Sequence, residues 1–122
     1  MKKILIIDDE KNILLALEMF LKKEKFRVLK ATDGIEGLKT AEEEIPDLIL
    51  LDIILPKMDG FLVCEVLKQN IKTRDIPVIF ISAKSQDKDI KKAIEAGGID
   101  YIIKPFTHVQ IKKVLTKYIG GK

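Results

Sequence analysis

Polar and ionisable side chains follow four short apolar runs, which end at residues 7, 51, 81 and 103. These side chains belong to Asp8, Asp9, Asp52, Ser82 and Lys104. Carboxylates, a hydroxyl and an ammonium group, brought together, can hold a divalent cation and stabilise charge on a phosphoryl group. The combination therefore predicts phosphoryl transfer to a carboxylate, with Asp52 as the nucleophile.

The three aspartates need a cation if all are to be ionised, because neighbouring carboxylates disfavour one another's charge. Mg²⁺ is the natural ion, since it prefers octahedral oxygen coordination and typically uses one or two carboxylates with water and phosphate oxygens. Zinc is disfavoured, because the only histidine, His108, and the only cysteine, Cys64, are far from these positions. Asp8 and Asp9, adjacent in sequence, fit one metal-holding corner.

The apolar runs themselves have the length and composition of strands. Residues 4–7, 48–51, 78–81 and 101–103 are nearly continuously apolar and rich in β-branched side chains. Such runs are typical of strands that are buried on both faces of a parallel sheet. A fifth run, residues 27–31, carries charges near both ends, which favours a position at the edge of the sheet.

Helical periodicity separates these runs. Ser85 is the predicted cap of the fourth helix, which should stop at Gly97. Thr107 opens a capping box for the fifth helix, which should end at Gly120 and Gly121. Alternating strands and helices predict an open, doubly wound parallel sheet with helices on both faces.

In an open sheet of this kind, ligands bind beyond the carboxyl ends of the strands, where the strand order reverses. If the strand order is 2-1-3-4-5, the first and third strands are neighbours. Asp8, Asp9 and Asp52 are then expected to converge within a few ångströms.

Length and composition limit the remaining possibilities. The chain has 122 residues, of which 47% are hydrophobic and 34% charged, which predicts one folded domain over residues 1–122. No apolar run approaches the about 20 residues of a membrane span. A single cysteine favours a reducing cytoplasm, and a net charge of +3 is too weak to indicate a nucleic-acid partner.

The sequence resembles the receiver domains of bacterial two-component response regulators over essentially its whole length. The motifs that carry this resemblance are Ile-Ile-Asp-Asp-Glu at 6–10, Leu-Leu-Asp-Ile-Ile-Leu-Pro-Lys-Met-Asp-Gly at 50–60, Ile-Ser-Ala at 81–83 and Tyr-Ile-Ile-Lys-Pro-Phe at 101–106. The resemblance implies a five-stranded, flavodoxin-like fold.

The resemblance also implies a role for each site residue. Asp52 would accept a phosphoryl group from a sensor histidine kinase or a phosphotransfer protein. Mg²⁺, for which Mn²⁺ could substitute, would be bound directly or through water by Asp8, Asp9, Asp52 and the backbone carbonyl of Ile54.

Ser82 and Lys104 would contact the phosphoryl group, and the Lys104–Pro105 bond would be cis. Phosphorylation would draw Ser82 inward and bias Tyr101 toward an inward rotamer. The face made by the fourth helix, the last strand and the last helix would change, and a downstream protein would bind there.

Some positions depart from common family patterns. Ile54 and Lys84 stand two residues beyond Asp52 and Ser82, where a side chain can help or hinder the attacking water, and neither is a carboxylate or amide. The last helix lacks the Glu and Arg residues typical of receivers that dimerise on DNA. This difference favours a stand-alone, monomeric regulator, and the alternative that the chain is the receiver half of a longer DNA-binding regulator stays open.

Lysines give the side of the last two helices a basic character, which favours an acidic partner there. These lysines are Lys84, Lys88, Lys91, Lys92, Lys112, Lys113 and Lys117.

Two enzyme-like alternatives fit the sequence less well. A phosphatase of the haloacid dehalogenase type needs a second aspartate two residues after the nucleophile, where this chain has Ile54. A flavin carrier needs a phosphate-binding loop, and Asp8 and Asp9 would repel the flavin phosphate. We therefore expect catalysis only of the chain's own phosphorylation and dephosphorylation.

Overall fold

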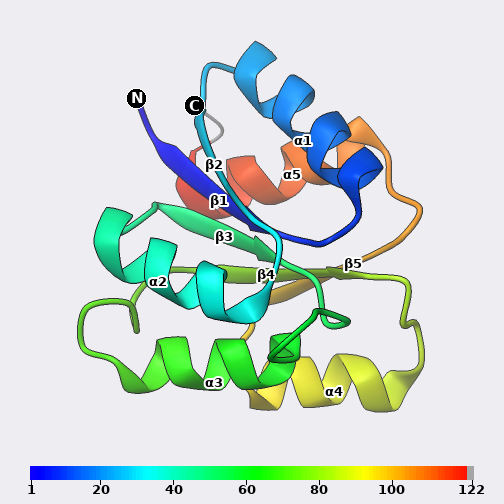
Figure 1. Ribbon diagram of the computed structural model, residues 1–122. Helices are drawn as coiled ribbons and strands as arrows, with labels where there is room; N and C mark the ends of the chain where they lie inside the picture. Colours follow the sequence, from blue (N-terminus) through cyan, green and yellow to red (C-terminus); the bar gives the residue numbers. More distant parts are fainter. Residues whose placement is uncertain (121–122) are drawn as a thin grey trace.

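The computed structural model describes residues 1–120 as five strands that alternate with five helices (Figure 1). The strands are β1 (Lys3–Ile7), β2 (Arg27–Ala31), β3 (Leu48–Leu51), β4 (Val78–Ser82) and β5 (Asp100–Ile103). The helices are α1 (Lys11–Lys23), α2 (Gly34–Glu44), α3 (Gly60–Gln69), α4 (Asp87–Glu95) and α5 (His108–Ile119). The predicted alternation is confirmed.

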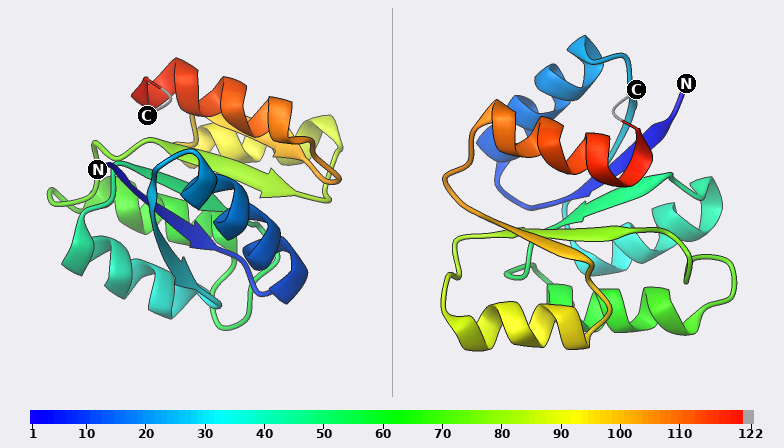
Figure 2. Two further views of the ribbon diagram at one scale, coloured as in Figure 1. Left: turned by 90° about the horizontal axis from the view of Figure 1, so that it is seen from above. Right: turned by 180° about the vertical axis from the view of Figure 1, so that it is seen from behind.

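All neighbouring strands are parallel, and their order is β2-β1-β3-β4-β5, as predicted. Helices α1 and α5 cover one face of the sheet, and α2, α3 and α4 cover the other (Figures 1 and 2). The predicted edge strand, β2, does lie at one edge. β5 forms the opposite edge, and Ile103 is 40% exposed, so the prediction that this strand is buried on both faces was wrong.

Side chains of the central strands alternate between two apolar cores, one on each face of the sheet. Leu5 and Ile7 of β1 join the core under α2, α3 and α4, whereas Ile4 and Ile6 join the core under α1 and α5. Because both faces are covered, the whole apolar run of β1 is buried. These two cores fix the strand ends on which the site is built.

Helix caps partly follow the predictions. Thr107 caps α5 and accepts a hydrogen bond from the Gln110 N–H, as its capping box predicts. Ser85 does not cap α4. The N-cap is Gln86, whose N–H donates to the Asp89 carboxylate at the third position of the helix. Gly120 ends α5 with a φ of 79°, and Gly121 lies outside the described residues.

Within residues 1–120, the helices are too short or too polar to cross a lipid bilayer.

Candidate functional site

Asp8 and Asp52 lie side by side at the carboxyl ends of β1 and β3. The parallel register pairs Ile7 with Leu51, and the N–H of Asp52 donates to the Ile7 carbonyl over 2.9 Å. Each aspartate is the first residue beyond its strand, so both side chains leave the sheet at the same level. Asp8 is 2% exposed and Asp52 is 5% exposed. Two carboxylates are therefore buried at the reversal point of the strand order.

Lys104, which follows β5, brings a positive charge to both carboxylates. Its Nζ lies 3.0 Å from Asp8 Oδ2 and 3.1 Å from Asp52 Oδ2. It also lies 2.6 Å from Glu10 Oε2. The N–H of Lys104 donates to the Ser82 carbonyl over 2.9 Å, which anchors the lysine backbone to β4. One ammonium group, placed by the end of β5, thus bridges carboxylates placed by the ends of β1 and β3.

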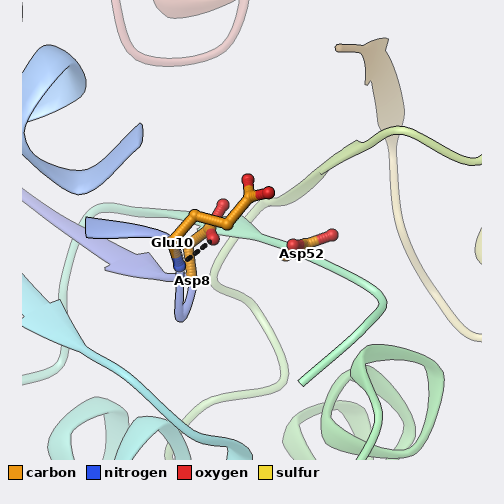
Figure 3. Close-up of side chains that lie close together, drawn as sticks. All are labelled: Asp8, Glu10 and Asp52. Atoms are coloured by element: carbon orange, nitrogen blue, oxygen red, sulfur yellow. Dashed lines mark hydrogen bonds between the residues drawn. The ribbon is translucent and has the colours of Figure 1, made fainter. Parts of the chain in front are cut away.

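The carboxylates of Asp8, Glu10 and Asp52 form a cluster whose ligand oxygens all lie within 4.8 Å of one another (Figure 3). Glu10 belongs to this cluster although it was not among the predicted site residues. Its N–H donates to Asp8 Oδ1 over 2.9 Å, shown as the dashed line in Figure 3. A donor set made only of carboxylate oxygens suits a hard divalent cation such as Mg²⁺.

Asp9 does not converge on Asp52 as the sequence predicted. Its side chain is exposed and lies outside the cluster of carboxylates. The chain bends at Asp9 after β1 ends, and the bond from the Glu10 N–H to Asp8 Oδ1 holds residue 10 beside residue 8. The run Asp8-Asp9-Glu10 offered Glu10 as a further carboxylate, but the sequence did not show which of these side chains turns toward Asp52.

Burial and charge act against each other at this site. Burial raises the pKa of Asp8, with a further contribution from the Asp52 charge, against hydrogen bonds from the Glu10 N–H and Lys104. Burial also disfavours the charge of Lys104, but hydrogen bonds to Glu10 and Asp8 and the charge of Asp52 outweigh it and raise the pKa of Lys104. Three carboxylates face one ammonium group, so the cluster retains negative charge.

Ser82 ends β4, and Tyr101 lies on the neighbouring strand β5, in register with Phe80. Ser82 is fully buried, and its Oγ accepts a hydrogen bond from the Lys84 N–H over 3.3 Å. The Tyr101 hydroxyl donates to the Lys84 carbonyl over 2.7 Å, and its ring stacks on Phe80. Burial raises the pKa of Tyr101, and a hydrogen bond with Ser82 opposes this rise. Lys84, two residues after the site serine, is thus tied to an aromatic side chain of the edge strand.

Other predicted residues have simpler surroundings. The Lys104–Pro105 bond is cis. The Ile54 side chain is 59% exposed, and the role of its carbonyl as a metal ligand stays a prediction. His108 stacks on Phe20 between α5 and α1, and burial raises the pKa of Cys64 to about 11. Neither His108 nor Cys64 belongs to the carboxylate cluster.

Comparison with known proteins gives the same picture over nearly the whole chain. The profile of the response regulator receiver domain family matches residues 4–116. The sequence is 40% identical over 120 residues to the alkaline phosphatase synthesis transcriptional regulatory protein PhoP of Bacillus subtilis, covering 95% of this chain and 49% of that protein. It is 42% identical over 106 residues to the DNA-binding dual master transcriptional regulator RpaA of Synechocystis, covering 87% of this chain and 44% of that protein. The chain therefore spans about half the length of the curated relatives it matches.

Solved structures of similar proteins share the fold. A two-component response regulator from Clostridium difficile has a TM-score of 0.92 at 28% identity, with 98% of this chain and 96% of that chain covered. The receiver domain of a sensor histidine kinase from Pseudomonas aeruginosa has a TM-score of 0.91 at 29% identity, with 98% of both chains covered. That receiver domain holds a magnesium ion coordinated in its active-site cleft.

Proposed function

Because this chain belongs to the response regulator receiver domain family of two-component signalling, we propose that it is switched by phosphorylation of Asp52. The observation that carries this assignment is the bridge of Lys104 between Asp8 and Asp52, with both carboxylates buried. A buried aspartate beside a fixed ammonium group has what a phosphate acceptor needs, since the ammonium can stabilise charge on the phosphoryl oxygens.

The phosphoryl donor in this proposal is a phosphohistidine of a sensor histidine kinase or a phosphotransfer protein. A carboxylate oxygen of Asp52 attacks the phosphorus in line with the leaving imidazole nitrogen. The P–N bond breaks, a P–O bond forms, and the imidazole leaves with its electron pair and takes up a proton. Lys104 and Ser82 then hold the phosphoryl oxygens through the ammonium and hydroxyl groups.

The carboxylate cluster fits a divalent cation, because its donor atoms are all oxygens and carry excess negative charge. We assign Mg²⁺, or Mn²⁺ in its place, to Asp8 and Asp52, with Asp9 and the Ile54 carbonyl as further ligands, directly or through water. The bound ion would supply positive charge near the transferred phosphoryl group. Lys104 contacts the same carboxylates, so the ion and the ammonium group share them.

The output of the switch is a changed surface over α4, β5 and α5. The hydrogen bond from Tyr101 to the Lys84 carbonyl supports this part of the proposal, because it joins the edge strand to the loop that follows Ser82. A shift of Ser82 toward the phosphoryl group would alter the same loop. We assign the readout to a downstream protein that binds a monomeric receiver in the cytoplasm, with no direct contact of this chain to nucleic acid.

Intact mass spectrometry after incubation with acetyl phosphate tests the proposal. The chain should gain one phosphoryl group in the presence of Mg²⁺, and hydroxylamine should remove it. Asp52→Asn should abolish the gain, whereas Asp59→Asn, which changes a carboxylate that only caps α3, should retain it. Rapid hydrolysis of the aspartyl phosphate could hide this gain in mass. Binding of beryllium fluoride in the presence of Mg²⁺ then tests the same site. Failure of both ligands to engage Asp52 would refute the assignment.

A further inference from the structure

β5 has one side without a strand partner within residues 1–120. The N–H of Lys104 donates to the Ser82 carbonyl, so this peptide faces β4. Successive residues of a parallel strand direct their main-chain groups to opposite sides. The peptide groups of Tyr101 and Ile103 therefore face outward. The Asp100 carboxylate covers the N–H of Tyr101 at 2.8 Å, which leaves the main chain around Ile103 as the open part of this edge.

A groove of about 570 Å³ follows this edge. It is lined by all four residues of β5 and by Gln110, Lys113, Val114 and Lys117 of α5. Side chains of a strand alternate between its two faces, so a groove that reaches four consecutive residues runs along the strand edge. The four α5 residues form one stripe of that helix. We call this hollow the β5–α5 groove; Figure 2 shows the strand and helix that border it.

Of the two helices on this side of the molecule, only α5 carries a net positive charge. The three lysines of α4 are balanced by Asp87, Asp89 and Glu95, whereas α5 has three lysines and no carboxylate. Lys112 pairs with Glu24 at 3.6 Å. In the part of the chain that the structure describes, no carboxylate lies within ion-pair distance of Lys113 or Lys117. Two ammonium groups without a carboxylate partner thus line the β5–α5 groove, whereas the one carboxylate of its lining, Asp100, accepts hydrogen bonds from the Tyr101 N–H and the Tyr118 hydroxyl.

We propose that the β5–α5 groove binds an extended acidic segment of a partner protein, which adds a strand to the open edge of β5. This inference rests on the proposed output face and names the chemistry of its partner. Main-chain groups of the segment would pair with those of Ile103. Acidic side chains on one face of the segment would meet Lys113 and Lys117, and apolar side chains on the other would cover the exposed part of Ile103.

A second copy of this chain fits the groove less well. Pairing of two β5 edges about a two-fold axis would place both α5 helices on the same side of the joint sheet. Lys113 and Lys117 of each copy would then face like charges, which is unfavourable in closely packed pairs. A partner with alternating acidic and apolar side chains could instead pair its carboxylates with these lysines and its main-chain groups with the edge of β5.

The test uses a fluorescein-labelled peptide of sequence Glu-Val-Glu-Val-Glu-Val-Glu and fluorescence anisotropy with the full chain. We expect binding with a Kd of about 100 μM, as suits a short segment that must become ordered. The double variant Lys113→Glu, Lys117→Glu should weaken binding by about tenfold or more. The matched variant Lys88→Glu, Lys91→Glu makes the same charge change on α4 and should stay within about threefold of the parent.

A peptide of the same sequence whose valines are N-methylated distinguishes strand addition from simple charge attraction. It keeps every charge but loses main-chain donors, so its binding should be about tenfold weaker. Equal binding of both peptides, equal loss in both double variants, or no binding would overturn the proposal. A dimer of the free chain in sedimentation that the peptide dissociates would replace it with self-association. Phosphorylation of Asp52 is measured separately by mass spectrometry. Loss of peptide binding can therefore be distinguished from a failure of the proposed function.

Discussion

Gly60, the first residue of α3, packs directly against the backbone of Asp52. A Cβ at position 60 would overlap the Asp52 carbonyl oxygen and lie 2.7 Å from Ile53 Cα. The N–H of Gly60 donates to the Ile53 carbonyl over 2.8 Å. The missing side chain therefore lets the start of α3 close against the peptide that holds the proposed phosphate acceptor.

We predict that Gly60→Ala impairs both stability and phosphorylation. The new methyl group cannot fit without a backbone shift, and overpacking of this kind costs about 1–3 kcal/mol of unfolding free energy. The shift displaces Asp52 from Lys104, so phosphorylation by acetyl phosphate should slow by about tenfold or more. Urea unfolding and the initial rate of phosphorylation measure the two effects.

Gly120→Ala is the matched control for this substitution. Gly120 has a φ of 79° and open space around the position of a Cβ, so alanine there adds backbone strain without a clash. We expect a loss of about 1 kcal/mol with an unchanged phosphorylation rate. A Gly60→Ala variant that is phosphorylated at the parent rate would show that contact with the Asp52 backbone does not position the acceptor.

Asp8→Asn should stabilise the metal-free protein at neutral pH. Burial and the neighbouring charge of Asp52 make the ionised form of Asp8 unfavourable, as its raised pKa shows. A neutral amide removes that cost, while Lys104 keeps Asp52 and Glu10 as partners. The gain in unfolding free energy at pH 7 in EDTA should be on the order of 1 kcal/mol. The same variant should lose most of the stabilisation that Mg²⁺ gives to the parent chain.

The pH dependence of this difference follows from the direction of the shift. Because the folded state raises the pKa of Asp8 above its usual value of 3.8, the folded protein binds this proton more tightly than the unfolded chain. The contribution of Asp8 to stability therefore falls as the pH rises from the usual value through the raised value. The advantage of Asp8→Asn should shrink as the pH is lowered through that interval. An advantage that grows on acidification would contradict this assignment.

The strand ends of the site could be predicted from sequence because buried parallel strands are continuous apolar runs. Asp52 follows such a run directly, and register with the neighbouring strand then places it beside Asp8. The orientation of Asp9 and Glu10 could not be predicted in the same way. Both follow a strand end, and only the conformation of the chain between β1 and α1 decides which carboxylate turns toward Lys104.

Two further differences between the predicted and the observed structure have local causes. Ser85 has the residue type of a helix cap, but Gln86 is the residue with extended backbone and a carboxylate three positions on to receive its N–H. The run at residues 101–103 is nearly continuously apolar, yet β5 is only partly buried, because it forms an edge of the sheet. Composition identified this strand, and the strand order 2-1-3-4-5 already implied that one of its sides is open.

Lys104→Met should change stability and metal affinity in opposite directions. Without the ammonium group, the carboxylates of Asp8, Glu10 and Asp52 repel one another, so the metal-free protein should lose about 1–3 kcal/mol at pH 7. Mg²⁺ no longer shares its ligands with a cation, so its affinity should rise by about tenfold. Unfolding midpoints measured against Mg²⁺ concentration give both quantities. The stabilising effect of Lys104 in the parent should persist up to its usual pKa of 10.5 and be lost as the pH rises through the raised value.

The exposed Lys88→Met variant controls for the loss of one positive charge. It lies on α4, away from the cluster, and should leave both stability and Mg²⁺ affinity within error of the parent. If Lys104→Met bound Mg²⁺ more weakly than the parent, the ammonium group would assist the ion instead of competing with it.

Ile54→Asn should shorten the lifetime of the phosphorylated chain. The Ile54 side chain is 59% exposed, two residues beyond Asp52, and has no group that can hold the water that attacks the phosphorus. An amide at this position could accept and donate hydrogen bonds to that water, so hydrolysis should become about threefold to tenfold faster. Intact mass against time after removal of acetyl phosphate gives the half-life. Ile54→Val keeps the position apolar and should leave the half-life unchanged, and equal acceleration in both variants would show that bulk, not water positioning, limits hydrolysis.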